Sequence, residues 1–310
     1  MKIIFMGTPD FAVPSLDILL KNNYTISAIV TAPDKPRGRG QQVSFTPVKE
    51  FAQKHSIPVL QPEQLKDESF ISRISNLKPD LFIVVAFRIL PKEVYTIPAK
   101  GSFNLHASLL PKYRGAAPIN WAIINGEKES GVTTFFLQDK VDTGNIILQK
   151  RIPISDEMNA GELHDALSEI GANAVLETVR LIESGKVNPQ QQDNTLSSPA
   201  PKIFKETCRI NWKQNTDSIH NFVRGLSPYP AAWTVHDDKQ IKIFRSKNSE
   251  FRIQNSESNV GGIVVTQNKI IVNTSDGSIE ILELQQEGKK RMSAEEFLRG
   301  YRFSENSKFV

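Results

Sequence analysis

Apolar residues form short runs separated by helix-like stretches over the first third of the chain. Five runs are predicted to be strands, at residues 2–6, 26–31, 57–60, 81–86 and 103–106. The stretch 12–20, between the first two, has the apolar spacing of a helix. Continuous apolar runs alternating with helices are typical of a parallel sheet covered on both faces. We therefore expect an α/β, doubly wound, mainly parallel Rossmann-like sheet, with chemistry just beyond the carboxyl ends of its strands.

The pattern changes after a long amphipathic helix predicted over residues 160–183. The next stretch, 188–202, is rich in Gln, Ser and Pro, which is typical of a linker. One helix and five short β-type runs follow, at residues 216–225 (helix), 231–235, 241–244, 262–265, 270–273 and 279–284. Such runs favour a small C-terminal β-barrel, OB-like in type. We expect a catalytic domain over 1–187, a linker over 188–206 and the barrel over 207–310.

Composition is that of an ordinary globular protein. The chain has 310 residues, of which 39% are apolar and 23% are charged. This fits two domains and excludes wholesale disorder. No apolar run approaches the ~18 residues that a membrane-spanning helix needs, and Gly7 and Pro9 interrupt the opening segment too early for a secretion signal. We therefore expect a soluble cytoplasmic protein that contacts no membrane.

The net charge of +4 arises in the last third of the chain. Residues 1–200 carry 21 basic and 21 acidic side chains, whereas residues 201–310 carry 17 and 13. A basic C-terminal module fits a polyanionic partner, and equally a well-solvated surface. A short basic run and a cationic, Gly-containing stretch are open to the same two interpretations. Each would either contact RNA phosphates or simply lie in solvent. Their residues are Lys289, Lys290 and Arg291 in the run, and Lys35, Arg37 and Arg39 in the stretch.

Several common chemistries are excluded by what the sequence lacks. The single cysteine, Cys208, rules out a disulfide framework, a CxxC redox pair and a cysteine-based zinc site. No cluster of carboxylates and histidines has metal-ligand spacing, so we expect no metal. Gly7, Thr8 and Pro9 follow the first strand without completing the GxGxxG pattern of a dinucleotide site.

The stretch GSFNLHASLLPKYRG, residues 101–115, is the richest in reactive side chains. Asn104 and His106 lie two apart on a predicted strand and so point to one side, and Asp142 follows in a polar turn. An amide can donate to an oxyanion, an imidazole can shuttle a proton, and a carboxylate can orient the imidazole. No serine elbow or nearby cysteine supplies a nucleophile. The set suits acyl transfer to an amine without a covalent enzyme intermediate, although hydrogen-bonded structure also fits this spacing.

The segments FNLHASLLPKYRGAAPINWAI and GVTTFFLQDKVDTGNIILQ closely resemble the signature of the folate-dependent formyltransferases. They match best the branch that acts on methionyl-tRNA. Three further segments match in family order, IIFMGTPDFAVPSL, TAPDKPRGRGQQVSFTPVKEFA and INWKQNTDSIHNFVRGLSPYPAAWT, so the resemblance covers almost the whole chain. It implies transfer of a formyl group from 10-formyltetrahydrofolate to the α-amine of initiator methionyl-tRNA, for translation initiation. It also implies a cytoplasmic monomer.

The resemblance implies roles for individual residues as well. The family's catalytic trio falls on Asn104, His106 and Asp142. Its methionyl pocket falls on Phe11, and its contact to the tRNA acceptor end falls on Arg39. In the wall of the folate pocket, Phe87 and Arg88 stand where the commoner pattern has Tyr-Gly and one more residue, which leaves the pterin contacts there open. The folate-binding positions are Ser108, Leu109, Leu110, Pro111, Phe87, Arg88 and Ile89.

Two rival functions remain for comparison. The first keeps formyl transfer but uses a nucleotide sugar or a purine precursor as the acceptor. The basic C-terminal domain argues against it, because a small acceptor does not require such a domain. The second is a non-catalytic RNA-binding protein, and the presence of Asn104, His106 and Asp142 argues against it.

Overall fold

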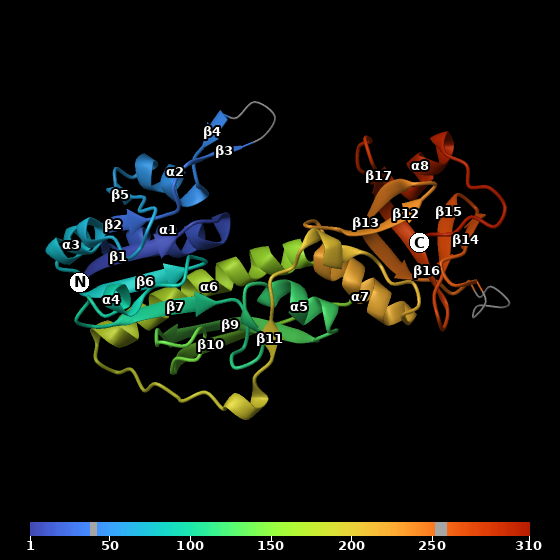
Figure 1. Ribbon diagram of the computed structural model, residues 1–310. Helices are drawn as coiled ribbons and strands as arrows, with labels where there is room; N and C mark the ends of the chain where they lie inside the picture. Colours follow the sequence, from blue (N-terminus) through green and yellow to red (C-terminus); the bar gives the residue numbers. More distant parts are fainter. Residues whose placement is uncertain (38–41, 252–258) are drawn as a thin grey trace. The chain divides into compact units, whose positions relative to one another are not determined.

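The computed structural model describes residues 1–37, 42–251 and 259–310. This part of the chain divides into two compact units (Figure 1). The first unit contains residues 1–115, 130–152 and 164–200, and the second contains residues 116–129, 153–163 and 201–310. The chain therefore passes between the units several times. The domain boundaries at 187 and 207 that composition indicates stay a prediction.

A seven-stranded sheet forms the centre of the first unit, with its strands in the order β10-β9-β7-β6-β1-β2-β5. Neighbours from β7 to β5 are parallel, whereas β9 runs antiparallel to β7. The predicted α/β class with a mainly parallel sheet is confirmed. The strands are β1 Lys2–Gly7, β2 Thr25–Val30, β5 Val59–Leu60, β6 Leu81–Val85, β7 Ser102–His106, β9 Glu129–Phe136 and β10 Ile146–Pro153.

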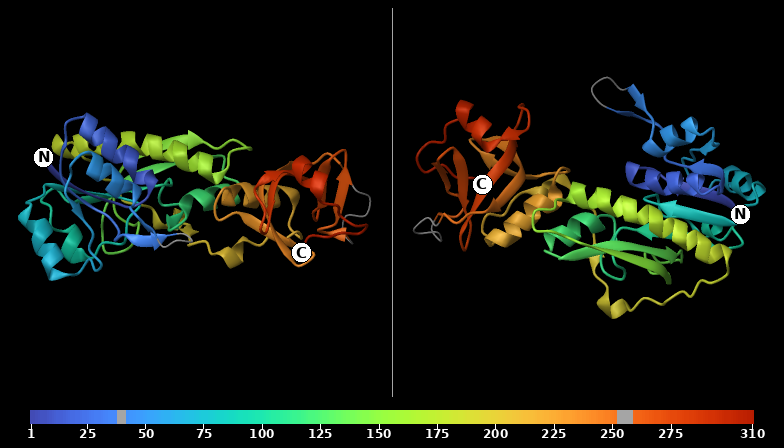
Figure 2. Two further views of the ribbon diagram at one scale, coloured as in Figure 1. Left: turned by 90° about the horizontal axis from the view of Figure 1, so that it is seen from above. Right: turned by 180° about the vertical axis from the view of Figure 1, so that it is seen from behind.

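Helices cover both faces of this sheet because its strands alternate their buried side chains between the faces. The long helix α6 has the predicted bounds and runs along the sheet in the views of Figures 1 and 2. It lies so close to β7 that a Cβ on Gly171 would be 2.8 Å from Leu105. On the other face, Phe70 and Ile74 pack with Phe82. The helices are α1 Val13–Lys21, α2 Pro47–Lys54, α3 Glu68–Asn76, α4 Lys92–Tyr95 and α6 Ala160–Glu183, with a 3-10 turn η1 Asp10–Ala12.

An antiparallel sheet forms the centre of the second unit, in the order β12-β13-β16-β15-β14, with β17 paired to β16. The predicted small C-terminal β domain is confirmed as an antiparallel sheet domain, and its OB-like closure into a barrel stays a prediction. Its core includes Ile219 and Val223 of α7 and the ring of Trp212, which stacks on Phe309. The elements are α5 Pro118–Ile124, α7 Thr216–Leu226, β12 Ala232–His236, β13 Lys239–Asn248, β14 Ile263–Thr266, β15 Lys269–Asn273, β16 Ser278–Gln286, β17 Met292–Ser293 and α8 Ala294–Gly300.

Side-chain caps explain where several helices begin. Thr46 accepts a hydrogen bond from the backbone of Lys49 at the start of α2, and Asp67 accepts from Ser69 and Phe70 at the start of α3. These bonds satisfy amide groups that have no partner inside the helix. Ser293 and Glu296 form a reciprocal capping box at α8.

Two further pairings involve stretches that the sequence indicates as loop or linker. β3 Lys35–Arg37 and β4 Gln42–Ser44 form an antiparallel hairpin. β8 Arg114–Gly115 pairs in parallel with β11 Pro199–Ala200. The 3-10 turns η2 Asn194–Leu196 and η3 Lys205–Cys208 flank β11. The stretch 188–206 is therefore ordered structure, part of which belongs to the first unit.

Candidate active site

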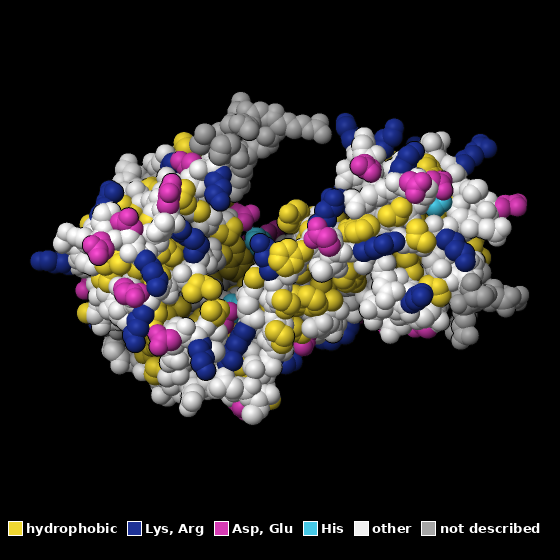
Figure 3. All heavy atoms as spheres, in the orientation of Figure 1, with side chains coloured by type: hydrophobic (Ala, Val, Ile, Leu, Met, Phe, Trp, Pro, Cys, Tyr) yellow, Lys and Arg dark blue, Asp and Glu magenta, His cyan; other side chains and the backbone are white. Residues whose placement is uncertain are grey.

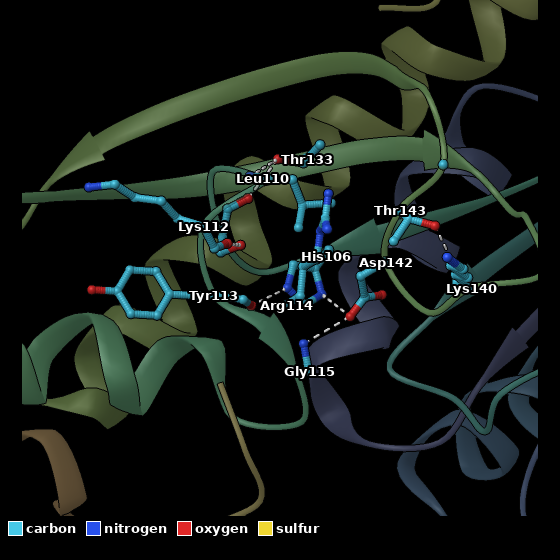
Figure 4. Close-up of polar contacts among 12 residues, drawn as sticks. His106, Leu110, Lys112, Tyr113, Arg114, Gly115, Thr133, Lys140, Asp142 and Thr143 are labelled. Carbon is cyan, nitrogen blue, oxygen red and sulfur yellow. Dashed lines mark hydrogen bonds and ion pairs between the residues drawn. The ribbon is translucent and has the colours of Figure 1, made fainter. Parts of the chain in front are cut away.

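His106 ends strand β7, at the carboxyl edge of the parallel part of the sheet. Its side chain is buried, and its Nε2 lies 2.8 Å from the backbone carbonyl oxygen of Tyr113 (Figure 4). A carbonyl oxygen only accepts hydrogen bonds, so this contact assigns the proton to Nε2. The other ring nitrogen, Nδ1, faces the carboxylate of Asp142.

Asp142 lies in the loop between β9 and β10, with a backbone φ of 54°. Its Oδ2 accepts a 2.9 Å hydrogen bond from the backbone N–H of Gly115 and lies 3.8 Å from His106 Nδ1. Both side chains are nearly enclosed, with 7% of His106 and 11% of Asp142 exposed. A carboxylate in this position is fixed by the backbone on one side and faces the imidazole on the other, which suits it to orient the ring.

Asn104 lies two residues before His106 on the same strand and points to the same side of the sheet. It is partly exposed, and within the described residues its carboxamide makes no hydrogen bond to the protein. An NH₂ group left open beside a buried His–Asp pair is available to a substrate oxygen. The structure thus brings together the three residues predicted to be catalytic.

The loop after β7 is braced by hydroxyl groups. The Ser108 hydroxyl donates to the carbonyl of Lys112 at 2.6 Å, and the Thr133 hydroxyl donates to the carbonyl of Ser108 at 2.6 Å. The backbone N–H of Leu110 in turn donates to Thr133. Ser108 and Leu110 are buried, whereas Leu109 and Pro111 are half-buried. The loop that supplies the Tyr113 carbonyl to His106 is therefore held against β9.

Sequence comparison supports a single family for both units. A family model described as formyl transferase matches residues 1–179, and one described as formyl transferase, C-terminal domain, matches residues 202–302.

The chain belongs to the formyl transferase family.

Two relatives show how similar this chain is to other members of the family. The methionyl-tRNA formyltransferase of Flavobacterium johnsoniae is 49% identical over 313 residues, covering 99% of this chain and 98% of the relative. That of Chlorobium phaeovibrioides is 50% identical over 305 residues, covering 97% and 96%.

Solved structures agree with the family at the level of the fold. WlaRD, a sugar 3N-formyl transferase crystallised in the presence of dTDP and 5-N-formyl-THF, has a TM-score of 0.68 at 25% identity, covering 94% of this chain and 99% of that one. HypX from Aquifex aeolicus, in complex with tetrahydrofolic acid, has a TM-score of 0.66 at 18% identity, covering 100% of this chain and 51% of that one.

In this formyl transferase, the loop after β6 is fixed through Arg88. Its guanidinium donates to the backbone carbonyls of Glu63 at 2.9 Å and Pro62 at 2.7 Å, and it lies 5.2 Å from the centre of the Phe87 ring. Burial lowers the pKa of this arginine. Ile89 is 74% exposed at the tip of the same loop. Arg88 thus joins the predicted folate-pocket wall to the segment between β5 and α3.

The remaining predicted residues lie in different parts of the molecule. Phe11 is buried in the first unit, where its ring contacts His164 edge-on at 5.2 Å. The backbone of Arg37 ends β3, while Arg39 lies outside the described residues. Lys289 and Lys290 are exposed in the second unit, as is their neighbour in the basic run.

That neighbour, Arg291, is exposed but already has partners within the protein. It forms an ion pair with Glu283 and lies over the ring of Phe244 at 4.3 Å. On the face shown in Figure 3, Lys and Arg side chains are scattered among acidic and neutral ones. The basic surplus of residues 201–310 is therefore partly engaged in local pairs.

Three groups at the site escaped prediction from the sequence. They are the Tyr113 carbonyl, the Gly115 N–H and the side chain of Gln192, which contacts the backbone of Asp142. Gly115 has a φ of 128°, and a Cβ there would lie 2.6 Å from the Ala200 carbonyl oxygen. A glycine in a predicted loop can indicate such a close backbone approach, so the sequence did contain a signal for this position. Gln192 stands in a Gln-rich run and offered no such signal.

Other reactive groups in the described ranges do not form a second centre. No group of three or more His, Cys, Asp or Glu side chains there could hold a metal ion. Cys208 is buried in the second unit, and burial raises the pKa of its thiol. In the same ranges, no helix has the length and apolar character to cross a bilayer.

Proposed function

We propose that the protein transfers the formyl group of 10-formyltetrahydrofolate to the α-amine of methionine esterified to initiator tRNA, giving N-formylmethionyl-tRNA. The observation that carries the proposal is the enclosed His106–Asp142 pair with the open Asn104 carboxamide beside it. It occurs in a chain that is about half identical, over nearly full length, to relatives named methionyl-tRNA formyltransferase.

The chemistry needs no covalent enzyme intermediate. The amine nitrogen attacks the formyl carbon, a tetrahedral intermediate forms, and the bond from that carbon to the folate nitrogen breaks. The amine loses a proton, and the folate nitrogen gains one. Asn104 and His106 stabilise the oxyanion, while Asp142 orients His106 and accepts the proton leaving the amine. Because Nε2 donates to Tyr113, His106 uses Nδ1 to bind the oxyanion, and it does so as the imidazolium, which carries a proton on both nitrogens and faces the Asp142 carboxylate.

The formyl donor, 10-formyltetrahydrofolate, is bound by two loops near His106. The loop of Ser108 to Pro111 and the loop of Phe87 to Ile89 form the folate site in this proposal, as the family resemblance implies. Support comes from the exposed apolar side chain of Ile89, which is suited to pack on a flat aromatic ring, and from the folate derivatives with which WlaRD and HypX were crystallised.

Acceptor binding divides between the units. Phe11 lies in the methionyl pocket, Arg37 and Arg39 contact the acceptor end of the tRNA, and the run from Lys289 to Arg291 contacts its backbone. A basic surplus confined to residues 201–310 supports a polyanionic partner. We further propose that the enzyme acts in the cytoplasm as a monomer and uses no metal.

Direct assay of three acceptors tests the proposal. The protein is incubated with 10-formyltetrahydrofolate and, in separate reactions, initiator methionyl-tRNA, a nucleotide-linked amino sugar or a purine-precursor amine. Formyl-methionine released from the tRNA by base is then quantified, with deacylated tRNA as the blank. We expect product with methionyl-tRNA alone. Product with the sugar or the purine precursor instead would identify a different acceptor, and no product with any of them would contradict formyl transfer.

A further inference from the structure

The segment after α6 returns to the active edge of the first unit. Gln190 exchanges two 2.8 Å backbone hydrogen bonds with Ile146 of β10, and further along the chain β11 pairs with β8. Gln192 lies between these two anchors and is only 5% exposed, although its neighbours Gln191 and Asp193 are exposed. One glutamine of a polar run is therefore directed into the protein.

The Gln192 carboxamide makes four hydrogen bonds. Its Nε2 donates to the backbone carbonyls of Asp142 at 2.9 Å and Gly144 at 2.8 Å. Its Oε1 accepts from Arg114, at 3.2 Å from Nε and 2.6 Å from Nη2. Two donors and two acceptor sites are the full capacity of a carboxamide. A carboxylate here would still accept from the guanidinium but would place oxygen against two carbonyl oxygens.

The two segments that Gln192 joins are those that contact His106. Arg114 lies between Tyr113, whose carbonyl accepts from His106 Nε2, and Gly115, whose N–H binds the Asp142 carboxylate. The other partner of Gln192 is the backbone of Asp142 itself. A single buried side chain thus holds together the loop on the Nε2 side of the imidazole and the loop on its Nδ1 side.

Close contacts at two glycines fix the same arrangement. A Cβ on Gly144 would lie 1.6 Å from the carbonyl oxygen of Phe136, and a Cβ on Gly115 would lie 2.6 Å from that of Ala200. Neither loop can move toward β9 or β11, because backbone already fills the space there. Gln192 adds hydrogen bonds that join the two loops to each other.

We propose that Gln192 is a positioning residue for formyl transfer, which holds the Asp142 carboxylate at its distance from His106 Nδ1 by joining the Asp142–Gly144 loop to Arg114. The proposal rests on the proposed function of this site. Gln192 does not touch the substrate; it acts through Asp142, whose backbone it joins to Arg114 in the loop of Tyr113 to Gly115. A displacement of about 1 Å at such a carboxylate can cost on the order of 10²-fold in rate.

Gln192→Glu is the informative variant, with Gln191→Glu as the matched control on an exposed neighbour. We expect Gln192→Glu to lower kcat on the order of 10²-fold and to change the KM for either substrate by no more than about twofold. Gln191→Glu should leave kcat unchanged. Wild-type kcat in Gln192→Glu would overturn the proposal, as would a rise in KM without a fall in kcat.

A double variant separates positioning from general structural damage. Because Gln192 acts through Asp142, Asp142→Asn with Gln192→Glu should lose no more kcat than Asp142→Asn alone. Losses that multiply in full would overturn the proposal. Gln192→Met, which removes both donors and the acceptor at similar volume, should match Gln192→Glu in kcat; if it instead retains wild-type activity, the hydrogen bonds are not required.

A spectroscopic measurement keeps this test independent of the acceptor. The ¹⁵N and ¹³C chemical shifts of the His106 ring are compared in wild type, Gln192→Glu and Gln191→Glu, without substrate. We expect a shift change at Nδ1 only in Gln192→Glu, because the carboxylate that faces it has moved. If the wild type forms no formyl-methionine, the proposed function fails, whereas unchanged His106 shifts in Gln192→Glu would refute the positioning role itself.

Discussion

His106 in the first unit and His236 in the second are both buried beside an aspartate, yet their surroundings differ. His106 Nδ1 lies 3.8 Å from Asp142, which is 11% exposed and comes from a distant loop. His236 Nδ1 lies 3.4 Å from Asp237, which is 75% exposed and adjacent in the chain. The first carboxylate is fixed by the Gly115 N–H, whereas the second reaches into solvent.

The rings around His236 complete the contrast. Its Nδ1 is 2.7 Å from the hydroxyl of Tyr301, and its ring packs edge-on against Phe303 at 5.0 Å and Phe309 at 6.1 Å. Asn104, on the same side of β7 as His106, has a carboxamide with no hydrogen-bond partner among the described residues. Burial next to a carboxylate therefore does not distinguish the histidine that we propose to be reactive. The difference lies in the unpaired Asn104 carboxamide and in a carboxylate held by backbone from elsewhere in the chain.

The largest expected effect belongs to the first histidine. We expect His106→Ala and Asn104→Ala each to lower kcat on the order of 10²–10³-fold, because each removes a donor to the oxyanion. Steady-state kinetics with formyl donor and methionyl-tRNA measures this, with His55→Ala as an exposed control. A loss of tenfold or less in both variants would break the comparison, since His106 would then be no more reactive than a core residue.

The second histidine should affect stability instead of rate. His236→Ala removes a ring from an aromatic cluster, so we expect the second unit to lose about 2–4 kcal/mol of unfolding free energy. All three tryptophans, Trp121, Trp212 and Trp233, belong to that unit, so urea unfolding followed by tryptophan fluorescence reports on it. The kcat of the folded variant should be that of wild type. A large fall in kcat, with stability unchanged, would reverse the assignment of the two histidines.

A half-buried cation in the first unit, Arg88, provides a second test of the distinction between reacting and supporting groups. The Arg88 guanidinium donates hydrogen bonds to two backbone carbonyls and lies near the Phe87 ring. We expect Arg88→Ala to raise the KM for 10-formyltetrahydrofolate about tenfold with kcat unchanged, since loss of charged hydrogen bonds loosens the proposed folate wall. Arg73→Ala, at an exposed position of α3, serves as control. A fall in kcat alone would place Arg88 with the reacting groups.

The smallest effect concerns acid stability of the second unit. Hydrogen bonds, above all from the backbone N–H of Thr216, hold the pKa of Asp276 below its usual range. A lowered carboxyl pKa adds stability above the unfolded value of about 3.9, and this stability is lost as pH falls toward the folded pKa. We expect the fluorescence-detected Tm to fall between about pH 5 and pH 3, and to fall less in Asp276→Asn. An equal slope in that variant and in an Asp238→Asn control would contradict this.

The sequence predicted most of the fold because its signals were local. The helix over 160–183 has the predicted bounds, and the strands of the parallel sheet were found from their apolar runs. The hairpin of β3 and β4 was not predicted, because both strands are short and neither has an apolar pattern: β3 is Lys-Pro-Arg and β4 is Gln-Val-Ser. Asn104, His106 and Asp142 were predicted to be catalytic from residue type and family resemblance; the structure places His106 beside Asp142, and the catalytic roles stay a prediction.

Other parts of the site depend on contacts that no local pattern records. The pairing of β8 with β11 joins residues more than eighty positions apart, and the burial of Gln192 is set by two carbonyls and a guanidinium from other segments. Both fall where composition indicates a linker. The sequence does not show which glutamine of a polar run is buried. A glutamine whose four hydrogen bonds are all made inside the protein is the same residue type as one that is hydrated by water.

The pairing of β8 with β11 also has a consequence for synthesis of the chain on the ribosome. The strands of the first sheet are complete once residue 153 has been made, but the residues that finish its active edge, Gln190 to Ala200, are made much later. Chains emerge from the ribosome N-terminus first and fold as they appear. A nascent polypeptide can therefore build the sheet early, yet the edge that carries His106 and Asp142 is completed only once residue 200 has been made, just before synthesis of residues 201–310 begins.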